Sequence, residues 1–300
     1  MTLKVDNIYK YYGDFLAVDN INFSLEEGKM LGFIGRNGAG KTTTFRMILG
    51  VTEPTNGNVT FQNKKIDTHL YNRIGYLPEE RGLHTKLKVY DELKYMAKLK
   101  GLDKKEIDYK IKYWLDEFKI ANNKNKKIEN LSKGNQQKIQ LLASIIHEPD
   151  LLILDEPFSG LDPINVELLK KTIKNLKEKG KTIILSTHRM DHVEELCDEI
   201  IIINEGKSVL QGNIKEVKSK YTQKNVVIKS DVDISEFIDK SKVIDYKNNN
   251  DYHYFKINNN EDAYILVKTL IENNISVRQL EISEPKMDEI FLTKVGEIYE

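Results

Sequence analysis

The sequence has little of what marks secreted or membrane-spanning proteins. Its one cysteine, Cys197, allows no disulfide within the chain, and nothing indicates an oxidising compartment. No stretch approaches the roughly 18–20 apolar residues that a membrane helix needs, and the densest, 139–146 (IQLLASII), carries Gln140 and Ser144. The N-terminal segment MTLKVDNIYKYY contains no apolar run typical of a signal peptide. These absences predict a cytosolic protein, unless a partner holds it at a membrane.

The chain also lacks an excess of either charge. Lys and Arg total 46 and Asp and Glu total 46, so the formal net charge is zero. This balance argues against a nucleic-acid partner bound by neutralising phosphates, and the lysine-rich run at 122–127 (NNKNKK) is better explained as a solvated loop. With 40% hydrophobic and 31% charged residues, the composition is that of a soluble globular protein. The 300 residues suffice for one large domain or two modest ones.

Residues 1–212 are predicted to alternate between strands and helices. Continuous apolar runs such as LLIL and IIII are typical of parallel strands that are buried on both faces. The expected strands are 30–34, 73–77, 151–154, 182–186 and 199–203. The expected helices include 41–49, 89–100, 104–118, 133–147 and 163–179. This alternation favours an α/β domain built on a parallel sheet.

The sequence pattern changes after Gly212. Residues 213–220 are predicted to form a short helix that closes the first domain, which places a boundary near residue 220. Residues 222–300 are predicted to form a small α+β domain in the order βαββαβ, which is that of a ferredoxin-like split unit. Its expected strands are 226–229, 243–246, 252–257 and 275–282, and its expected helices are 234–239, 261–272 and 287–295.

Residues 35–42, Gly-Arg-Asn-Gly-Ala-Gly-Lys-Thr, fit the phosphate-loop pattern G-x-x-x-x-G-K-[ST] in full. The glycines let successive N–H groups point at phosphate oxygens, and the helix that begins near Lys41 adds the positive end of its dipole. We expect Lys41 to reach the β- and γ-phosphates, Thr42 to ligate Mg²⁺ and Thr43 to contact the α-phosphate. The alternative is a glycine-rich turn that fits by chance, and the predicted strand and helix on either side argue against it.

The carboxylate pair Asp155-Glu156 directly follows the apolar strand predicted at 151–154. The carboxyl end of a buried parallel strand is where such sheets bind ligands. We expect Asp155 to hold Mg²⁺ through a water, and Glu156 to accept the proton of a water that attacks the γ-phosphate. Taken alone, the pair would be interpreted as solvated side chains at a strand end. The phosphate loop earlier in the chain favours the catalytic interpretation.

Further segments resemble the motifs of the ATP-binding-cassette (ABC) ATPases. Residues 131–137 (LSKGNQQ) resemble the family's signature segment, usually Leu-Ser-Gly-Gly-Gln, and 159–162 (SGLD) resemble its D-loop. Residues 186–188 (STH) resemble the segment with the switch histidine, and 76–79 (YLPE) lie where the family has its Q-loop. Tyr12 resembles the aromatic residue that stacks on adenine. The motifs occur in the family's order.

The resemblance implies a P-loop ABC ATPase in residues 1–220, with a mostly parallel core sheet, an antiparallel β subdomain and a helical subdomain at about 80–150. It implies ATP as the nucleotide, Mg²⁺, Glu156 as the catalytic base, and His188 as the residue that contacts the γ-phosphate and orients the attacking water. The implied Mg²⁺ ligands are Thr42, Glu79 and Asp155. The other nucleotide-binding residues implied are Tyr12, Val18, Gly35, Arg36, Asn37, Gly38, Ala39, Gly40, Lys41, Thr43, Ser132, Gly134, Asn135 and Asp162.

Two departures from the family pattern stand out. Lys133 replaces the first glycine of the signature and Asn135 replaces its glutamine, whereas Gly134 is kept. Glu79 replaces the glutamine of the Q-loop, and its carboxylate can still ligate Mg²⁺ or water. Both changes resemble a bacterial export subfamily with LSKGN and LPEERGL segments, and residues 284–291 (EPKMDEIF) resemble the C-terminal extension of that subfamily.

The resemblance implies the ATP-hydrolysing subunit of an ABC exporter, peripheral on the inner face of the plasma membrane, with a separate integral membrane permease. In this family each ATP site needs a phosphate loop from one subunit and a signature from another. Two cassettes must therefore meet head-to-tail, as a homodimer or with a paralogous cassette.

Two alternatives are open at this point. The first is a soluble ABC ATPase acting on nucleic acid or ribosomes, which usually has two cassettes or a long coiled-coil insertion; the interval 43–130 holds no sustained heptads. The second is a phosphate-loop kinase of small molecules, which gives no reason for the signature, D-loop and switch histidine to occur together.

Overall fold

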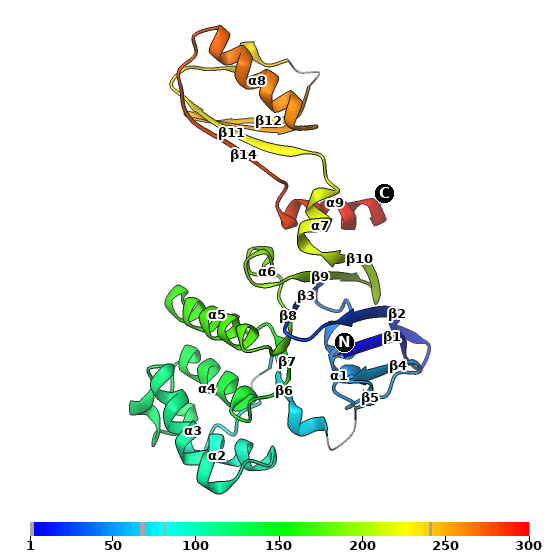
Figure 1. Cartoon of the computed structure of the whole chain (residues 1–300), viewed down its shortest axis with the longest axis vertical. Coiled ribbons are helices and arrows are strands. Elements are labelled where there is room, and N and C mark those ends of the chain that lie inside the picture. Colours follow the sequence, from blue (N-terminus) through cyan, green and yellow to red (C-terminus); the bar gives the residue numbers. More distant parts are fainter. Residues whose placement is uncertain (1–2, 67–69, 81, 240–241, 300) are drawn as a thin grey trace. The chain divides into compact units, whose positions relative to one another are not determined.

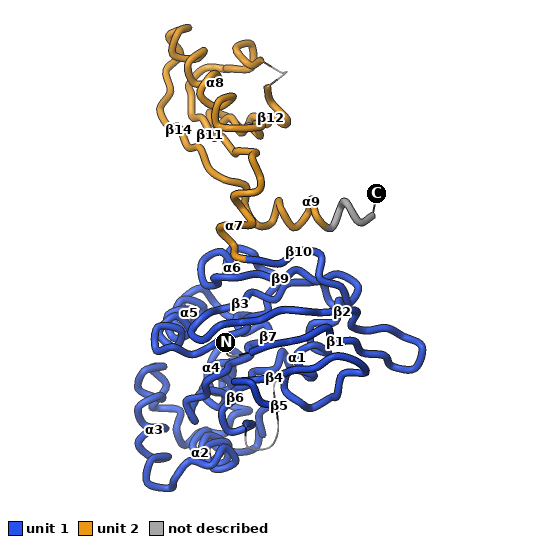
Figure 2. The backbone as a smooth tube through the Cα atoms, turned by 45° about the vertical axis from the view of Figure 1, so that its right-hand side comes forward, with its two compact units in different colours: residues 1–212 blue, residues 213–300 orange. Residues whose placement is uncertain are grey.

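The computed structural model describes residues 3–66, 70–80, 82–239 and 242–299. The chain divides into two compact units, Met1–Gly212 and Asn213–Glu300 (Figure 2). Within the described residues, none of the helices has both the length and the apolar surface needed to cross a bilayer.

A six-stranded sheet forms the centre of the first unit, with strand order β10-β9-β3-β8-β7-β6 (Figure 1). The pairs from β9 to β6 are all parallel. Every residue of β3, β7 and β8 is buried, which explains the uninterrupted apolar runs in the sequence and confirms the predicted parallel sheet. The strands are β3 (Met30–Ile34), β6 (Ile74–Leu77), β7 (Leu151–Asp155), β8 (Thr182–Ser186), β9 (Glu199–Asn204) and β10 (Lys207–Asn213).

A second, antiparallel sheet has the order β2-β1-β4-β5. Its buried side chains join those of α1 (Lys41–Ile48) and of one face of the parallel sheet in a single apolar cluster. Phe33 of β3 and Phe45 of α1 meet in this cluster with their ring centroids 5.1 Å apart. The cluster fixes where α1 begins relative to the sheet. The strands are β1 (Leu3–Tyr12), β2 (Phe15–Leu25), β4 (Asn56–Phe61) and β5 (Lys64–Lys65).

The other face of the parallel sheet is covered by helices, which share a second apolar cluster with β7 and β8. Trp114 and Phe118 of this cluster pack edge to face. The α-helices of this region are α2 (Val89–Leu99), α3 (Lys104–Glu117), α4 (Lys133–Ile145), α5 (Pro163–Glu178) and α6 (Met190–Leu196). Short 3₁₀ turns occur at η1 (Leu70–Arg73), η2 (Ala121–Asn123) and η3 (Ile128–Asn130). The run at 122–127 thus falls on η2 and the loop after it.

The second unit is built on a four-stranded antiparallel sheet with order β12-β13-β11-β14. Since β13 lies between β11 and β12, the order is that of the predicted split unit. One face packs against α8 through Ala263, Leu266 and Leu270. The elements are α7 (Ile214–Ser219), β11 (Lys224–Ser230), η4 (Ser235–Phe237), β12 (Val243–Asn249), β13 (Tyr252–Ile257), α8 (Asn260–Glu272), β14 (Val277–Ser283) and α9 (Met287–Tyr299).

Two features of the second unit differ from the sequence prediction. The helix expected at 234–239 forms only the 3₁₀ turn η4, because the Asp233 side chain accepts the N–H of Ser235 and the segment is too short and too rich in β-branched and turn-forming residues to propagate a helix. The chain divides after Gly212, so α7 groups with the second unit.

A chain that ends at Lys220 is expected to fold on its own. Among the described residues, the apolar cluster around α1 extends to Ile203 and the one beneath the helices to Leu196, whereas the cluster around α8 begins at Val226. In thermal unfolding followed by circular dichroism, truncation should leave one cooperative transition, displaced by less than about 4 °C, the change that ~1 kcal/mol produces in a unit of this size. A chain that ends at Leu196 is the control: it removes β9 from the sheet and should not fold. Loss of the transition in the longer chain would contradict this division.

Candidate active site

The loop between β3 and α1 needs its glycines for two separate reasons. Gly38 and Gly40 have φ angles of 83° and 101°, in the left-handed region that favours glycine. A Cβ atom on Gly35 would lie 2.6 Å from the carbonyl oxygen of Ile203, and one on Gly40 would lie 2.7 Å from that of Ala17. The loop therefore combines a backbone conformation and a close approach that a larger residue would disrupt.

Lys41, the first residue of α1, is folded back over this loop. Its Nζ atom donates to the carbonyl oxygens of Gly35, at 2.7 Å, and Arg36, at 3.2 Å, and the side chain is buried. The loop thus holds a positive charge within its own curve, at the N-terminus of a helix. This is an arrangement that binds anions, phosphate groups in particular.

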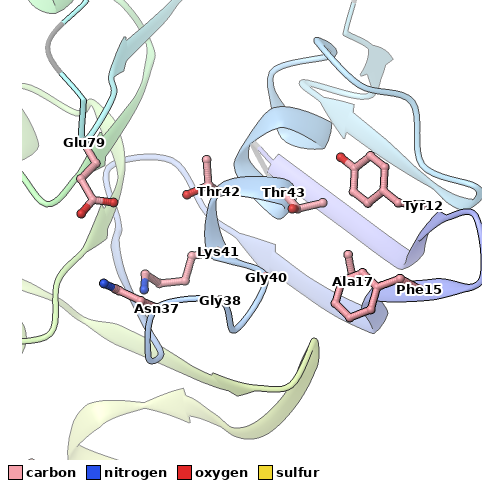
Figure 3. A pocket seen from close by; sticks show the side chains of 10 residues that line it. All are labelled: Tyr12, Phe15, Ala17, Asn37, Gly38, Gly40, Lys41, Thr42, Thr43 and Glu79. Atoms are coloured by element: carbon pink, nitrogen blue, oxygen red, sulfur yellow. The ribbon is translucent and has the colours of Figure 1, made fainter.

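A cavity of about 370 Å³ opens beside the loop (Figure 3). Figure 3 shows Lys41, Asn37 and Glu79 toward one end and the rings of Tyr12 and Phe15 at the other. One end is therefore charged and the other aromatic, which suits a ligand with a planar ring and an anionic tail. The lining residues are Tyr12, Phe15, Ala17, Asn37, Gly38, Gly40, Lys41, Thr42, Thr43 and Glu79.

Sequence reasoning missed Phe15 and Ala17 as lining residues. Tyr12 and Phe15 pair across the β1–β2 hairpin, at a turn in which Gly13 has a φ angle of 58°. Paired residues of a hairpin point to the same face, so Phe15 follows Tyr12 into the cavity. The spacing Tyr-Gly-Asp-Phe, with a turn between two aromatic residues, was the signal available in the sequence.

Asp155, at the end of β7, is held between two hydroxyl groups. Thr42 Oγ1 donates to its Oδ2 atom at 3.4 Å, and Ser186 Oγ, at the end of β8, donates to its Oδ1 atom. Burial raises the pKa of Asp155; the charge of Glu79 adds to this increase, and the hydrogen bond from Ser186 opposes it. Two carboxylates and a hydroxyl therefore converge here, the oxygen donors that a hard divalent cation prefers.

Glu156 is placed by the backbone as well as by its side chain. Its φ angle is 48°, unusual for a residue other than glycine, and its N–H group donates to Ser186 Oγ at 3.2 Å. The Nδ1 atom of the exposed His188 lies 3.0 Å from Glu156 Oε2. Burial raises the pKa of Glu156, and the hydrogen bond with His188 lowers it. A carboxylate of this kind is suited to general-base chemistry.

The other predicted site residues gather at the N-termini of two helices. Ser132 caps α4 and accepts the N–H of Asn135 at 3.4 Å, and Asp162 caps α5 and accepts the N–H of Asn165 at 3.0 Å. The two helix ends are adjacent, because a Cβ atom on Gly134 would lie 3.0 Å from Asn165 Nδ2. Among the residues that the structure describes, those lining the cavity beside Lys41 include none of Ser132, Gly134, Asn135 and Asp162.

Two further predicted residues, Val18 and Ala39, pack against the loop or hydrogen-bond within it. Val18 is buried, and its Cγ2 atom would lie 3.5 Å from a Cβ atom on Gly40. Ala39 belongs to the apolar cluster around α1, and its N–H group donates to the carbonyl oxygen of Arg36 at 3.1 Å. They shape the loop without lining the cavity themselves.

Comparisons with known proteins bear directly on this arrangement. Residues 18–159 match the family described as "ABC transporter", and residues 212–295 match that described as "ATP-binding protein DrrA1-3-like, C-terminal domain". YhaQ of Bacillus subtilis, named as an uncharacterized ABC transporter ATP-binding protein, is 46% identical over 298 residues, 99% of this chain and 100% of that protein.

The chain belongs to the ABC transporter ATP-binding family. The bacitracin transport ATP-binding protein BcrA of Bacillus licheniformis is 31% identical over 316 residues, 98% of this chain and 97% of that protein. Among solved structures, CbiO1 of Clostridium perfringens, part of the ABC transporter complex CbiONQ, superposes with a TM-score of 0.65 and 32% identity over 73% of this chain and 91% of that chain.

The ABC family assignment confirms the predicted cassette fold and an ATP-hydrolysing transporter subunit. The cassette's departures from the family pattern now have positions in the structure. Lys133 is exposed at the start of α4, and the backbone N–H group of Asn135 donates a hydrogen bond to Ser132 Oγ. Glu79 lines the cavity opposite Thr42 (Figure 3).

In a plot of kcat for ATP hydrolysis against pH, the fall in kcat on the acid side is expected to follow the protonation of Glu156. A base must be deprotonated, so kcat should fall as the pH drops through a pKa that burial has raised above that of an ordinary glutamate. In His188→Ala the hydrogen bond that lowers this pKa is absent, so the midpoint of this fall should move to higher pH. The measurement is kcat against pH for both proteins in the same buffers.

Arg189→Gln is the matched control for that pH profile. It removes a neighbouring positive charge that pairs with Asp191 instead, and should leave the midpoint where it is. An unchanged midpoint in His188→Ala would contradict the assignment of this carboxylate as the base.

Proposed function

We propose that this chain hydrolyses ATP as one half of a cassette dimer that drives export through a separate membrane permease. The observation that carries the proposal is the division of the site residues into two groups within one chain. Lys41 and Glu79 line the cavity, whereas Ser132 and Asp162 lie at helix ends outside its lining. A second cassette, placed head-to-tail, would bring its own Ser132 to this cavity and complete the site.

The chemistry follows from the groups around the cavity. Water attacks the γ-phosphorus of ATP, the bond from this phosphorus to the bridging oxygen breaks, and ADP and phosphate result. Glu156 takes the proton of the water, while His188, bonded to the same carboxylate, orients the water. Lys41 and the N–H groups of the loop offset the negative charge that develops on the phosphate oxygens.

The residues present also suit Mg²⁺. Thr42, Asp155 and Glu79 would hold it, and the ion would supply positive charge to the phosphate oxygens of the substrate. Burial raises the pKa of Asp155, and the nearby Glu79 raises it further, so this chain places two carboxylates where a cation would relieve their repulsion.

Several observations support a membrane permease as the partner. No described helix could itself cross a bilayer. BcrA is named as a transport protein, and CbiO1 as part of a transporter complex. The LSKGN and LPEERGL segments resemble those of an export subfamily, which favours export and a position on the cytoplasmic face of the membrane. The second cassette is proposed to be a copy of this chain, with a paralogous cassette as the other outcome of a purification with the permease.

The first alternative, an ATPase acting on nucleic acid or ribosomes, gains no support from the fold. The interval between phosphate loop and signature contains β4 to β6 and the short helices α2 and α3, which pack into the apolar cluster of the cassette. None of the described elements there extends as a coiled coil. The formal net charge of zero also argues against a nucleic-acid partner.

Glu156→Gln is expected to keep ATP binding and to lower kcat by about 10²–10⁴-fold, because an amide of the same shape cannot accept the proton of water. With ATP and Mg²⁺ present, this variant should persist as a dimer in size-exclusion chromatography with light scattering. Glu178→Gln, at the exposed end of α5, is the control for a change of charge alone and should behave as wild type. Hydrolysis by Glu156→Gln near the wild-type rate would contradict the proposal.

A further inference from the structure

Gln140 is a buried polar residue that the chemistry above does not use. It lies in the middle of α4 within the run IQLLASII and is 4% exposed. Its Nε2 atom donates to the carbonyl oxygens of Pro78, at 2.9 Å, and Glu80, at 3.2 Å. A buried amide is costly unless it is hydrogen-bonded, so these two bonds account for a glutamine in an otherwise apolar stretch.

The two carbonyl groups that Gln140 holds flank a residue of the site. Glu79 lies between them and lines the cavity across from Thr42 (Figure 3). The segment Pro78–Glu80 follows β6 directly and belongs to neither helix nor strand. A side chain that holds the backbone on both sides of Glu79 therefore restricts where its carboxylate can lie.

Gln137 makes a similar contact one helical turn earlier. Its Nε2 atom donates to the carbonyl oxygen of Pro157 at 3.1 Å, and Pro157 directly follows Glu156. Residues three apart lie on the same face of a helix, so this face of α4 holds the segments after both β6 and β7. The same helix begins at Ser132. One rigid element thus contacts both of the carboxylate-bearing segments.

We propose that Gln140 is a positioning residue, which holds the backbone around Glu79 so that this carboxylate faces the nucleotide cavity. The inference rests on the proposed function, in which Glu79 is one of the residues that would hold Mg²⁺ beside the nucleotide. Glutamine suits this task, since one amide group supplies two donors for two carbonyl oxygens. Its Oε1 atom has no partner among the described residues, so the donors alone account for its bonding.

A double-mutant cycle separates this role from simple packing. Gln140→Leu should lower kcat about tenfold, with little change in the KM for ATP, because the loss of two buried hydrogen bonds releases Glu79 while the phosphate loop is untouched. In a Glu79→Ala background, the same substitution should change kcat by less than about twofold, because no carboxylate is left to position. An equal tenfold effect in both backgrounds would overturn the proposal.

Lys138→Met is the matched control. Lys138 is also buried on α4, and it donates to the carbonyl oxygen of Phe118 at 3.3 Å, on a segment that does not line the cavity. Its effect on kcat should be the same with and without Glu79→Ala. Should Gln140→Leu fail to fold, Gln140→Glu keeps the shape but replaces both N–H donors with a carboxylate oxygen, and the same loss of effect in the Glu79→Ala background is expected.

A second readout needs no hydrolysis. In the nucleotide-free protein, the backbone amides of Glu79 and Glu80 should exchange with solvent about tenfold faster in Gln140→Leu than in wild type, and Lys138→Met should leave them unchanged. Unchanged exchange in Gln140→Leu would overturn the proposal. A wild-type protein that does not hydrolyse ATP would overturn the proposed function, and the exchange result would then decide whether Gln140 holds this segment.

Discussion

Three parallel strands, β3, β7 and β8, are buried along their whole length. Within this part of the sheet, charged side chains that must reach a ligand can therefore lie only where the strands end. Each strand ends at one part of the candidate site. The loop with Lys41 comes after β3, the pair Asp155-Glu156 lies at the end of β7, and the segment from Ser186 to His188 lies at the end of β8. The carboxylate pair is held by groups at the end of the neighbouring strand β8, because Ser186 donates a hydrogen bond to Asp155 and His188 is hydrogen-bonded to Glu156. Burial raises the pKa of both carboxyl groups. Because the sheet is rigid, it fixes the positions of these side chains relative to one another.

Much of this architecture could be predicted from the sequence, because both faces of the core strands are buried. Continuous apolar runs and a full phosphate-loop pattern gave the parallel sheet and the start of α1. The strands of the antiparallel sheet are harder to place from sequence alone, since the β1–β2 pairing contains register shifts and β4 is half exposed. Phe15 enters the cavity only through hairpin pairing. Gln140 reaches Pro78 across 62 positions of sequence, a contact that no local pattern indicates. The prediction of a helix at 234–239 was wrong, because a local hydrogen bond from the backbone to a side chain competes with a short helix.

The helix α4 has a particular place in this account. Its N-terminus carries Ser132, proposed to act on the ATP of a second cassette, and its buried face holds the segments that carry Glu79 and Glu156. A helix moves as one body, so a shift at its N-terminus and a shift of those segments are mechanically linked. The second unit has its own apolar core around α8.

The central claim is that each ATP site takes its phosphate loop from one chain and its signature from another, and a mixing experiment tests it most directly. Lys41→Ala removes the charge aimed at the phosphates, and Ser132→Arg removes the signature hydroxyl from the ATP bound to the other chain, so each variant alone should be inactive. A hybrid dimer has one site with an intact loop and an intact signature. An equimolar mixture should therefore regain ATP hydrolysis, up to about a quarter of the wild-type rate if the two chains pair at random. A mixture no more active than its separate components would contradict the account.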